Sequence, residues 1–177
     1  MTEQETLKIL QRPDLGVEAI AQAEPITVSR EHFPWLSSEQ MDVPTVHVKL
    51  EDGTTQFRYG SLVGCNPGTE KLAAEVPPQQ SKNAEQGMFK ALAALLNGQH
   101  ATSVDSMSQY VAGDIPVFKT AKKGADVSRL YFAVTSDTDG QPLVFKLGVA
   151  KHKKQDSLLA ILKGTPGEKR KKDGGKR

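Results

Sequence analysis

The segment that most constrains the fold is a pair of strand-like runs near the C-terminal end. They span Val127 to Thr135 and Pro142 to Ala150 and are joined by the turn sequence Asp-Thr-Asp-Gly. Runs of this length and composition around such a turn indicate a β-hairpin. The second run leads directly into Lys151-His152-Lys153-Lys154. A strand that ends in lysines suits polyanion binding, and the histidine among them adds a group suited to phosphodiester chemistry.

The elements around this hairpin indicate the fold class. Ile115 to Thr120 reads as a preceding strand, and about Asp156 to Lys163 as a closing helix. Asn83 to Asn97 shows helical spacing of Met, Phe and Leu, with Asn83 as a predicted N-cap. Consecutive strands with short turns favour an antiparallel β-meander packed against helices on one face. The predicted class is therefore α+β.

The first eighty residues show weaker patterns. Apolar residues between Thr6 and Ala23 recur with loose helical spacing, which predicts one or two short helices. Val43 to Leu50 and Thr54 to Tyr59 flank an Asp-Gly turn and predict a hairpin; His47 falls on its polar face, where a solvated role is the ordinary interpretation. A proline-rich break follows. We therefore expect an N-terminal extension (1–80), an α+β domain (81–163) and a disordered basic tail (164–177).

Charge is distributed very unevenly along the chain. The net charge is only +2, but residues 116–177 hold fifteen Lys or Arg and six Asp or Glu, a surplus of nine positive charges. The last fourteen residues account for four of these, so five remain on the part expected to fold. A basic block of this size favours phosphate-rich partners.

Composition excludes several other classes. The single cysteine, Cys65, permits no intrachain disulfide and has no neighbouring ligands for zinc. No apolar run is long enough to span a membrane, and the acidic start lacks an export-signal pattern. We therefore expect a cytoplasmic protein that uses no metal or organic cofactor and does not associate with membranes.

Alternation along the hairpin strand suggests which face carries chemistry. Leu130, Phe132 and Val134 point to one side and are the predicted core set. Arg129 and Tyr131 point to the other, which we expect to be open. Lys119 from the preceding strand is expected on that face, rimmed by Lys122, Lys123 and Lys151 to Lys154. Arginine grips phosphate bidentately and tyrosine stacks on bases, so this face is either a cationic groove or an ordinary solvated surface.

Three short motifs give a family resemblance. Phe118-Lys119, Ser128 to Phe132 (Ser-Arg-Leu-Tyr-Phe) and Leu147 to His152 (Leu-Gly-Val-Ala-Lys-His) resemble the RelE/ParE-type toxin fold. The resemblance covers about residues 84–163. It implies a RelE-like α+β domain and a toxin of a toxin-antitoxin pair, namely a hydrolase that cleaves RNA, classically messenger RNA on the ribosome. It also implies an acidic antitoxin protein as a second partner.

The resemblance also implies roles for individual residues. RelE-like endoribonucleases activate a ribose 2′-hydroxyl to attack the adjacent phosphate. Arg129 would hold that phosphate and stabilise the developing charge, and His152 would act as general acid or base. Lys119 is the third catalytic candidate. The candidates for RNA binding are Lys122, Lys123, Tyr131, Lys151, Lys153 and Lys154.

Two alternatives to the endoribonuclease remain open at this point. The same residues suit a nucleic-acid-binding protein that does not cleave, for which binding would fall steeply with salt. They also suit an interaction protein whose basic block binds an acidic protein, such as a cognate antitoxin.

Overall fold

The fold is known from a computed structural model, which describes residues 17–50, 53–99, 104–107, 115–120 and 128–164. In chain order the strands are β1 (Val17–Ser29), β2 (Gln40–Leu50), β3 (Gln56–Ser61), β4 (Val104–Met107), β5 (Val117–Thr120), β6 (Ser128–Ser136) and β7 (Pro142–Lys151). The helices are α2 (Pro67–Ala74), α3 (Pro78–Leu95) and α4 (Gln155–Leu162), with short 3₁₀ turns η2 (Val63–Cys65) and η3 (His152–Lys154). The α+β class is therefore confirmed.

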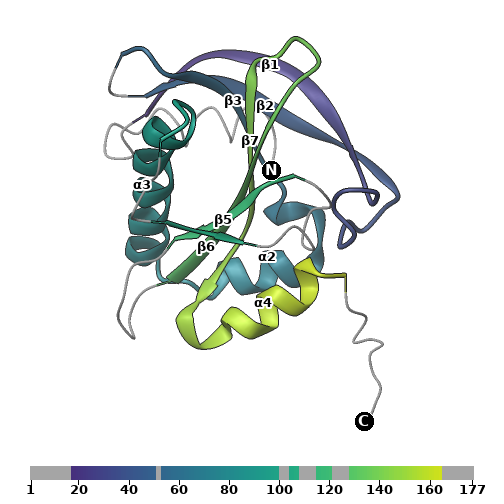
Figure 1. Cartoon of the computed structure of the whole chain (residues 1–177). Helices are drawn as coiled ribbons and strands as arrows, with labels where there is room; N and C mark the ends of the chain where they lie inside the picture. The colour runs from purple at the N-terminus through teal and green to yellow at the C-terminus, as the bar shows by residue number, and fades with distance from the viewer. Residues whose placement is uncertain (1–16, 51–52, 100–103, 108–114, 121–127, 165–177) are drawn as a thin grey trace.

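All seven described strands form one curled sheet in the order β1-β2-β3-β7-β6-β5-β4 (Figure 1). Neighbouring strands are antiparallel except β3 and β7, which run parallel. The predicted antiparallel meander is present in β5, β6 and β7, and the parallel pairing of β7 with β3 is an addition that the sequence did not predict. The domain boundary predicted near residue 80 falls at the start of α3. The strands before it (β1 to β3) and after it (β4 to β7) belong to the same sheet.

Helices cover both faces of the sheet, not one face as predicted. On the α3 side, Phe89 and Leu92 pack against Phe57 and Phe132. On the other side, α2 and α4 pack Leu72, Leu158 and Leu162 against the sheet, together with a buried aromatic segment that contains Phe33 and Trp35. Figure 1 shows α4 running back beneath the sheet from the end of β7. We call the first layer the α3 core and the second the α2–α4 core.

An irregularity in β7 explains how α4 fits so closely. Tyr131 pairs with Gly148 and Phe132 pairs with Lys146, so Leu147 is an extra residue in β7. Leu147 belongs to the α2–α4 core. Gly148 also faces this core, because a Cβ added to it would lie 2.8 Å from Cδ1 of Leu158. Two successive residues thus face α4, which strict alternation does not allow. The glycine leaves room for the leucine of the helix.

Three sequence-based elements differ from the structure. The part of the predicted N-terminal helix that is described, from Val17 to Ala23, is strand and belongs to β1; residues 6–16 lie outside the described residues. α3 begins at Pro78, not at Asn83, because proline is favoured in the first helical turn. β4 lies between α3 and β5, where the sequence predicted no strand. The other predicted elements are confirmed, namely the β2–β3 hairpin, the strands β5, β6 and β7, and the closing helix α4.

One ion pair lies between α3 and the sheet. Nζ of Lys146 is 3.3 Å from Oε2 of Glu85, and each side chain is only 13% exposed. Tyr59 lies nearby in the same layer, and its burial, followed by the charge of Glu85, raises its pKa well above the ordinary value. Charges in such a place are tolerated when they are paired, and each becomes costly when its partner is removed.

We expect Lys146→Met to destabilise the fold by roughly 3 kcal/mol, because it leaves the Glu85 carboxylate without its cation. The double variant Lys146→Met, Glu85→Leu is expected to recover most of this loss. Urea denaturation measures both, with Lys90→Met on the exposed side of α3 as the control. Equal destabilisation by the single and double variants would contradict a pairing role.

Candidate functional site

Most of the predicted site residues meet at one end of the sheet. β5 and β7 end there and β6 begins there, because both strands are antiparallel to β6. Leu130 donates its backbone N–H to Oγ1 of Thr120, which fixes the end of β5 against the start of β6. We call this region the basic end; its described members are Lys119, Arg129, Lys151, His152, Lys153 and Lys154.

The strand register places two of these cations side by side. Lys119 pairs with Tyr131, and Arg129 lies two residues before Tyr131, so Lys119 and Arg129 are diagonal neighbours on one face. Such neighbours are about 7–8 Å apart in an antiparallel pair. Both side chains are half-buried. Arg129 is itself opposite Ala150, the residue before Lys151, so the β6 arginine adjoins the exit of β7.

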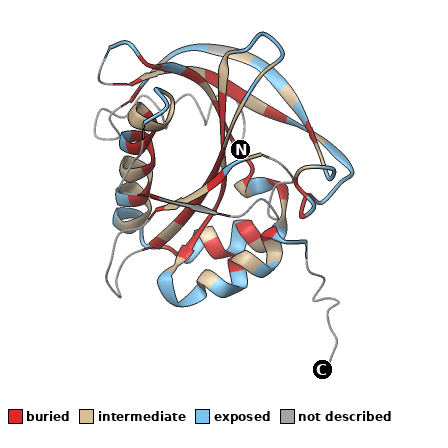
Figure 2. Ribbon diagram, in the orientation of Figure 1, coloured by how far each residue is buried: buried red, intermediate tan, exposed pale blue. Residues whose placement is uncertain are grey.

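The segment that follows β7 turns away from the sheet. His152, Lys153 and Lys154 form η3 and are exposed, whereas Lys151 is half-buried at the strand end opposite Ser128. In Figure 2 this connection between β7 and α4 is coloured as exposed. Asp156, in the first turn of α4, is the nearest acidic residue along the chain. The connection therefore carries an exposed positive charge.

The prediction for Tyr131 is wrong. Its side chain is 0% exposed and lies in the α2–α4 core, as does Ala133. The face expected to be open is therefore covered, and Tyr131 is not available to stack on a base in this structure. Lys122 and Lys123 lie outside the described residues, so their predicted role stays untested.

Other candidate groups are less suited to chemistry. Cys65 is buried and free, and burial raises the pKa of its thiol, which disfavours the reactive thiolate. Within the described ranges, no group of three or more His, Cys, Asp or Glu is arranged to hold a metal ion. No described helix is long and apolar enough to cross a membrane.

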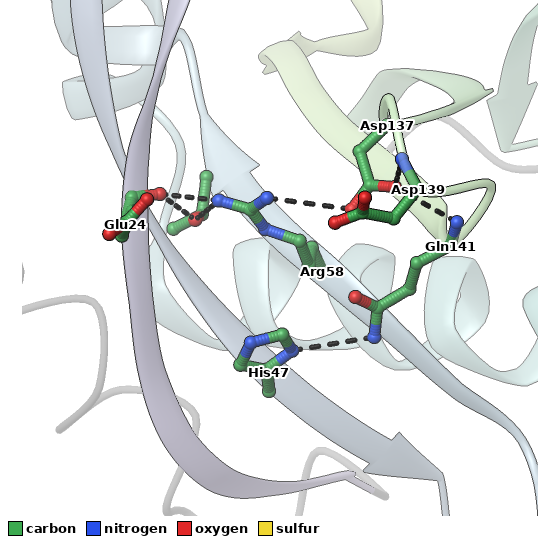
Figure 3. A network of polar contacts seen from close by, with 7 residues as sticks. Glu24, His47, Arg58, Asp137, Asp139 and Gln141 are labelled. Atoms are coloured by element: carbon green, nitrogen blue, oxygen red, sulfur yellow. Dashed lines mark hydrogen bonds and ion pairs between the residues drawn. The ribbon is translucent and has the colours of Figure 1, made fainter.

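A second polar cluster, which the sequence did not predict, lies at the opposite end of β7. Arg58 in β3 donates through Nη1 to Asp137 at 3.5 Å, and through Nη2 to Oγ1 of Thr45 at 2.9 Å and to the backbone carbonyl of Glu24 (Figure 3). That carbonyl lies where the β1–β2 register shifts between Ala23 and Ile26. The arginine thus satisfies a carbonyl at an irregularity of β1.

Asp137 completes the cluster from the β6–β7 turn. Its Oδ1 accepts the backbone N–H groups of Asp139 and Gln141, both at 2.9 Å. Burial opposes the charge of Asp137, but the N–H groups of Gln141 and Asp139 and the Arg58 guanidinium together hold its pKa below the ordinary value. No sequence motif predicts this cluster, because its members come from β1, β2, β3 and the β6–β7 turn, which are far apart in the sequence.

The lowered pKa has a consequence for stability. Folding favours the charged carboxylate, so its stabilising effect is present above the ordinary pKa of 3.8 and is lost as the pH falls through the lower folded pKa. We expect Asp137→Asn to lower the thermal midpoint at about pH 7, and the difference from wild type to vanish near about pH 2. Asp139→Asn, on the same turn, is the matched control. A difference that persists in acid would overturn this assignment.

Comparison of the chain with protein-family models, with curated proteins and with solved structures gives no match. The RelE/ParE resemblance therefore rests on the residues quoted above and stays a prediction.

Proposed function

We propose that the protein binds the phosphate backbone of nucleic acid through the basic end. The observation that supports this most directly is the convergence of three strand ends, which gathers Lys119, Arg129 and the Lys151–Lys154 segment at one edge of the sheet. Phosphate contacts need several cations at the surface and no deep cavity. An RNA strand is the preferred ligand, since the resemblance points to RNA.

The shape of the basic end favours binding over base recognition. The exposed members of η3 are a histidine and two lysines, and the aromatic residue expected for stacking is buried. Lysines without an aromatic platform hold the backbone and read little sequence. We therefore propose affinity that depends strongly on salt and weakly on sequence.

Cleavage of the bound RNA is the second candidate function. It is supported by the position of Arg129, which is opposite Ala150, two residues before His152. In this proposal Arg129 holds the scissile phosphate, and His152 takes the proton from the attacking 2′-hydroxyl or gives one to the leaving oxygen. The β5–β6–β7 meander, with α3 before it and α4 after it, is compatible with a RelE-like arrangement.

Salt-dependent binding tests the first proposal. We expect a fluorescently labelled single-stranded RNA to lose affinity between about 50 and 200 mM salt, with a logarithmic slope of about −0.7 for each phosphate neutralised. The triple variant Lys151→Ala, Lys153→Ala, Lys154→Ala is expected to reduce that slope by about 2. The double variant Lys71→Ala, Lys90→Ala, on exposed helix positions, is the matched control.

A shortened chain separates the basic end from the tail. A protein that ends at Gly164 lacks six basic residues but keeps the basic end intact. We expect it to retain the difference between wild type and the triple variant. If the triple variant binds as wild type does, or if the shortened chain no longer binds, the basic end is not the binding surface. Tight binding to an acidic protein but not to RNA would favour the antitoxin-type partner instead.

Cleavage is tested by following the length of the bound RNA. If the second candidate holds, RNA is cut while the same sequence with 2′-deoxyribose stays intact, because the nucleophile is then missing. We expect Arg129→Ala and His152→Ala each to abolish cutting, with Lys90→Ala as the control. Intact RNA in the wild-type reaction leaves binding as the function, and cutting that survives both substitutions removes these residues from the mechanism.

A further inference from the structure

The helix α4 packs on the rest of the protein through two close contacts at glycines. In β7, a Cβ added to Gly148 would lie 2.8 Å from Cδ1 of Leu158. In α2, a Cβ added to Gly68 would lie 2.8 Å from Cδ1 of Ile161. Leu158 and Ile161 are three residues apart, so they lie on one side of α4. Both glycines therefore let α4 come closer than any side chain at these positions would.

The C-terminal end of α4 is held in the same way. Gly164 follows the helix with a φ of +70°, and its N–H donates to the carbonyl of Ile161 at 2.9 Å. A Cβ added to Gly164 would lie 2.8 Å from Cβ of Pro34, which lies between Phe33 and Trp35 of the buried aromatic segment. α4 is thus fixed by contacts along its whole length.

The connection η3, which precedes α4, has little structure of its own to fix it. Its three side chains are exposed, and no side chain caps the start of η3 or of α4. α4 has only eight residues, and helices shorter than about 12–15 residues are marginal in water unless they pack on something. The position of η3 therefore follows from β7 before it and from the packing of α4 after it.

The contact between Gly148 and Leu158 closes this part of the chain into a loop. The chain leaves β7 at Lys151 and returns to contact β7 at Leu158 (Figure 1). Gly148 pairs with Tyr131, which lies two residues from Arg129 on the same face of β6. A shift of α4 away from β7 would therefore move the exposed cations of η3 relative to Arg129.

We propose that Gly148 is a positioning residue for the nucleic-acid surface, because its contact with Leu158 sets where η3 presents its cations relative to Arg129. The consequence for binding rests on the proposed function, whereas the placement of η3 does not. Cations that a packed helix holds in place lose less conformational freedom when they meet phosphates. They are expected to bind more tightly than the same cations on a displaced or loosened segment.

The placement is tested in the full-length variant Gly148→Ala. The added methyl would meet Cδ1, Cδ2 and Cγ of Leu158, and that side chain is fully buried, so we expect the helix to move. The backbone amide signals of residues 152–154 should then shift in ¹H–¹⁵N NMR spectra. Gly60→Ala is the matched control, because its methyl would crowd β2, at 3.1 Å from the carbonyl oxygen of Pro44, and not α4. Unchanged signals in Gly148→Ala, or equal shifts in Gly60→Ala, would refute the proposal.

The effect on binding is read from the labelled RNA of the salt titration. We expect Gly148→Ala to bind about fivefold more weakly at about 0.1 M salt, with a slope shallower by about 0.7, which corresponds to one phosphate contact. Gly60→Ala is expected to bind as wild type does, even at an equal loss of thermal stability. If wild-type protein does not bind RNA, the proposed function fails, but the amide signals still decide the placement. Wild-type binding by Gly148→Ala would mean that this glycine serves the fold alone.

A second variant, Leu158→Val, covers the case in which Gly148→Ala does not fold. It shortens the side chain on the helix side of the contact, and we expect the same amide signals to move. The double variant Gly148→Ala, Leu158→Val has room for the methyl again, so it should bind RNA more tightly than Gly148→Ala does. Unmoved signals in Leu158→Val, or losses that simply add in the double variant, would show that the two residues do not act through their contact.

Discussion

The parallel pairing of β3 with β7 is the interaction on which the architecture depends. Arg58 to Ser61 pair with Leu143 to Lys146, and this single ladder joins the first three strands to the last four. Parallel pairs need a long crossover between the strands, and here α2, α3 and three further strands supply it. Because β7 has a neighbour on each edge and a core on each face, seven of its ten residues are buried, and alternation gives way to a mostly apolar run that only Lys146 interrupts.

The Arg58 cluster strengthens this junction. Parallel ladders are slightly less stable per residue than antiparallel ones, and this ladder is only four residues long. Arg58 connects the β6–β7 turn, through Asp137, to the irregular region of β1, through the Glu24 carbonyl. One side chain thereby ties β1 and β2, on one side of the ladder, to the β6–β7 turn on the other. The same arrangement holds the guanidinium in place, with its Nε buried.

Sequence patterns predicted local elements well and long-range relations poorly. The β6–β7 hairpin and the β2–β3 hairpin were predictable, because an Asp-Gly turn between alternating runs is a local signal. The strand from Val17 to Ala23 was not, since alanine and isoleucine suit either period and its partner strand is more than twenty residues away. Alternation correctly placed Leu130 and Tyr131 on opposite faces, but it carries no information about what covers a face. The same limit hid the Arg58 cluster, whose members meet only after the sheet has formed.

A sheet covered on both faces restricts where this protein meets its partners. Side chains in the middle of β6 and β7 pack in one core or the other, so groups that contact solvent gather where the strands end. At one end the chain places lysines, Arg129 and His152, and at the other it places Arg58, His47 and Gln141. Tyr131 is an example: it lies in the middle of β6 and is buried in the core, although a tyrosine could stack on a base if it were exposed. The two ends share β7 but differ in charge, because the first gathers lysines, Arg129 and His152, whereas Arg58 at the second is paired with Asp137. This difference makes the first end the better candidate for the polyanion that we propose as the ligand.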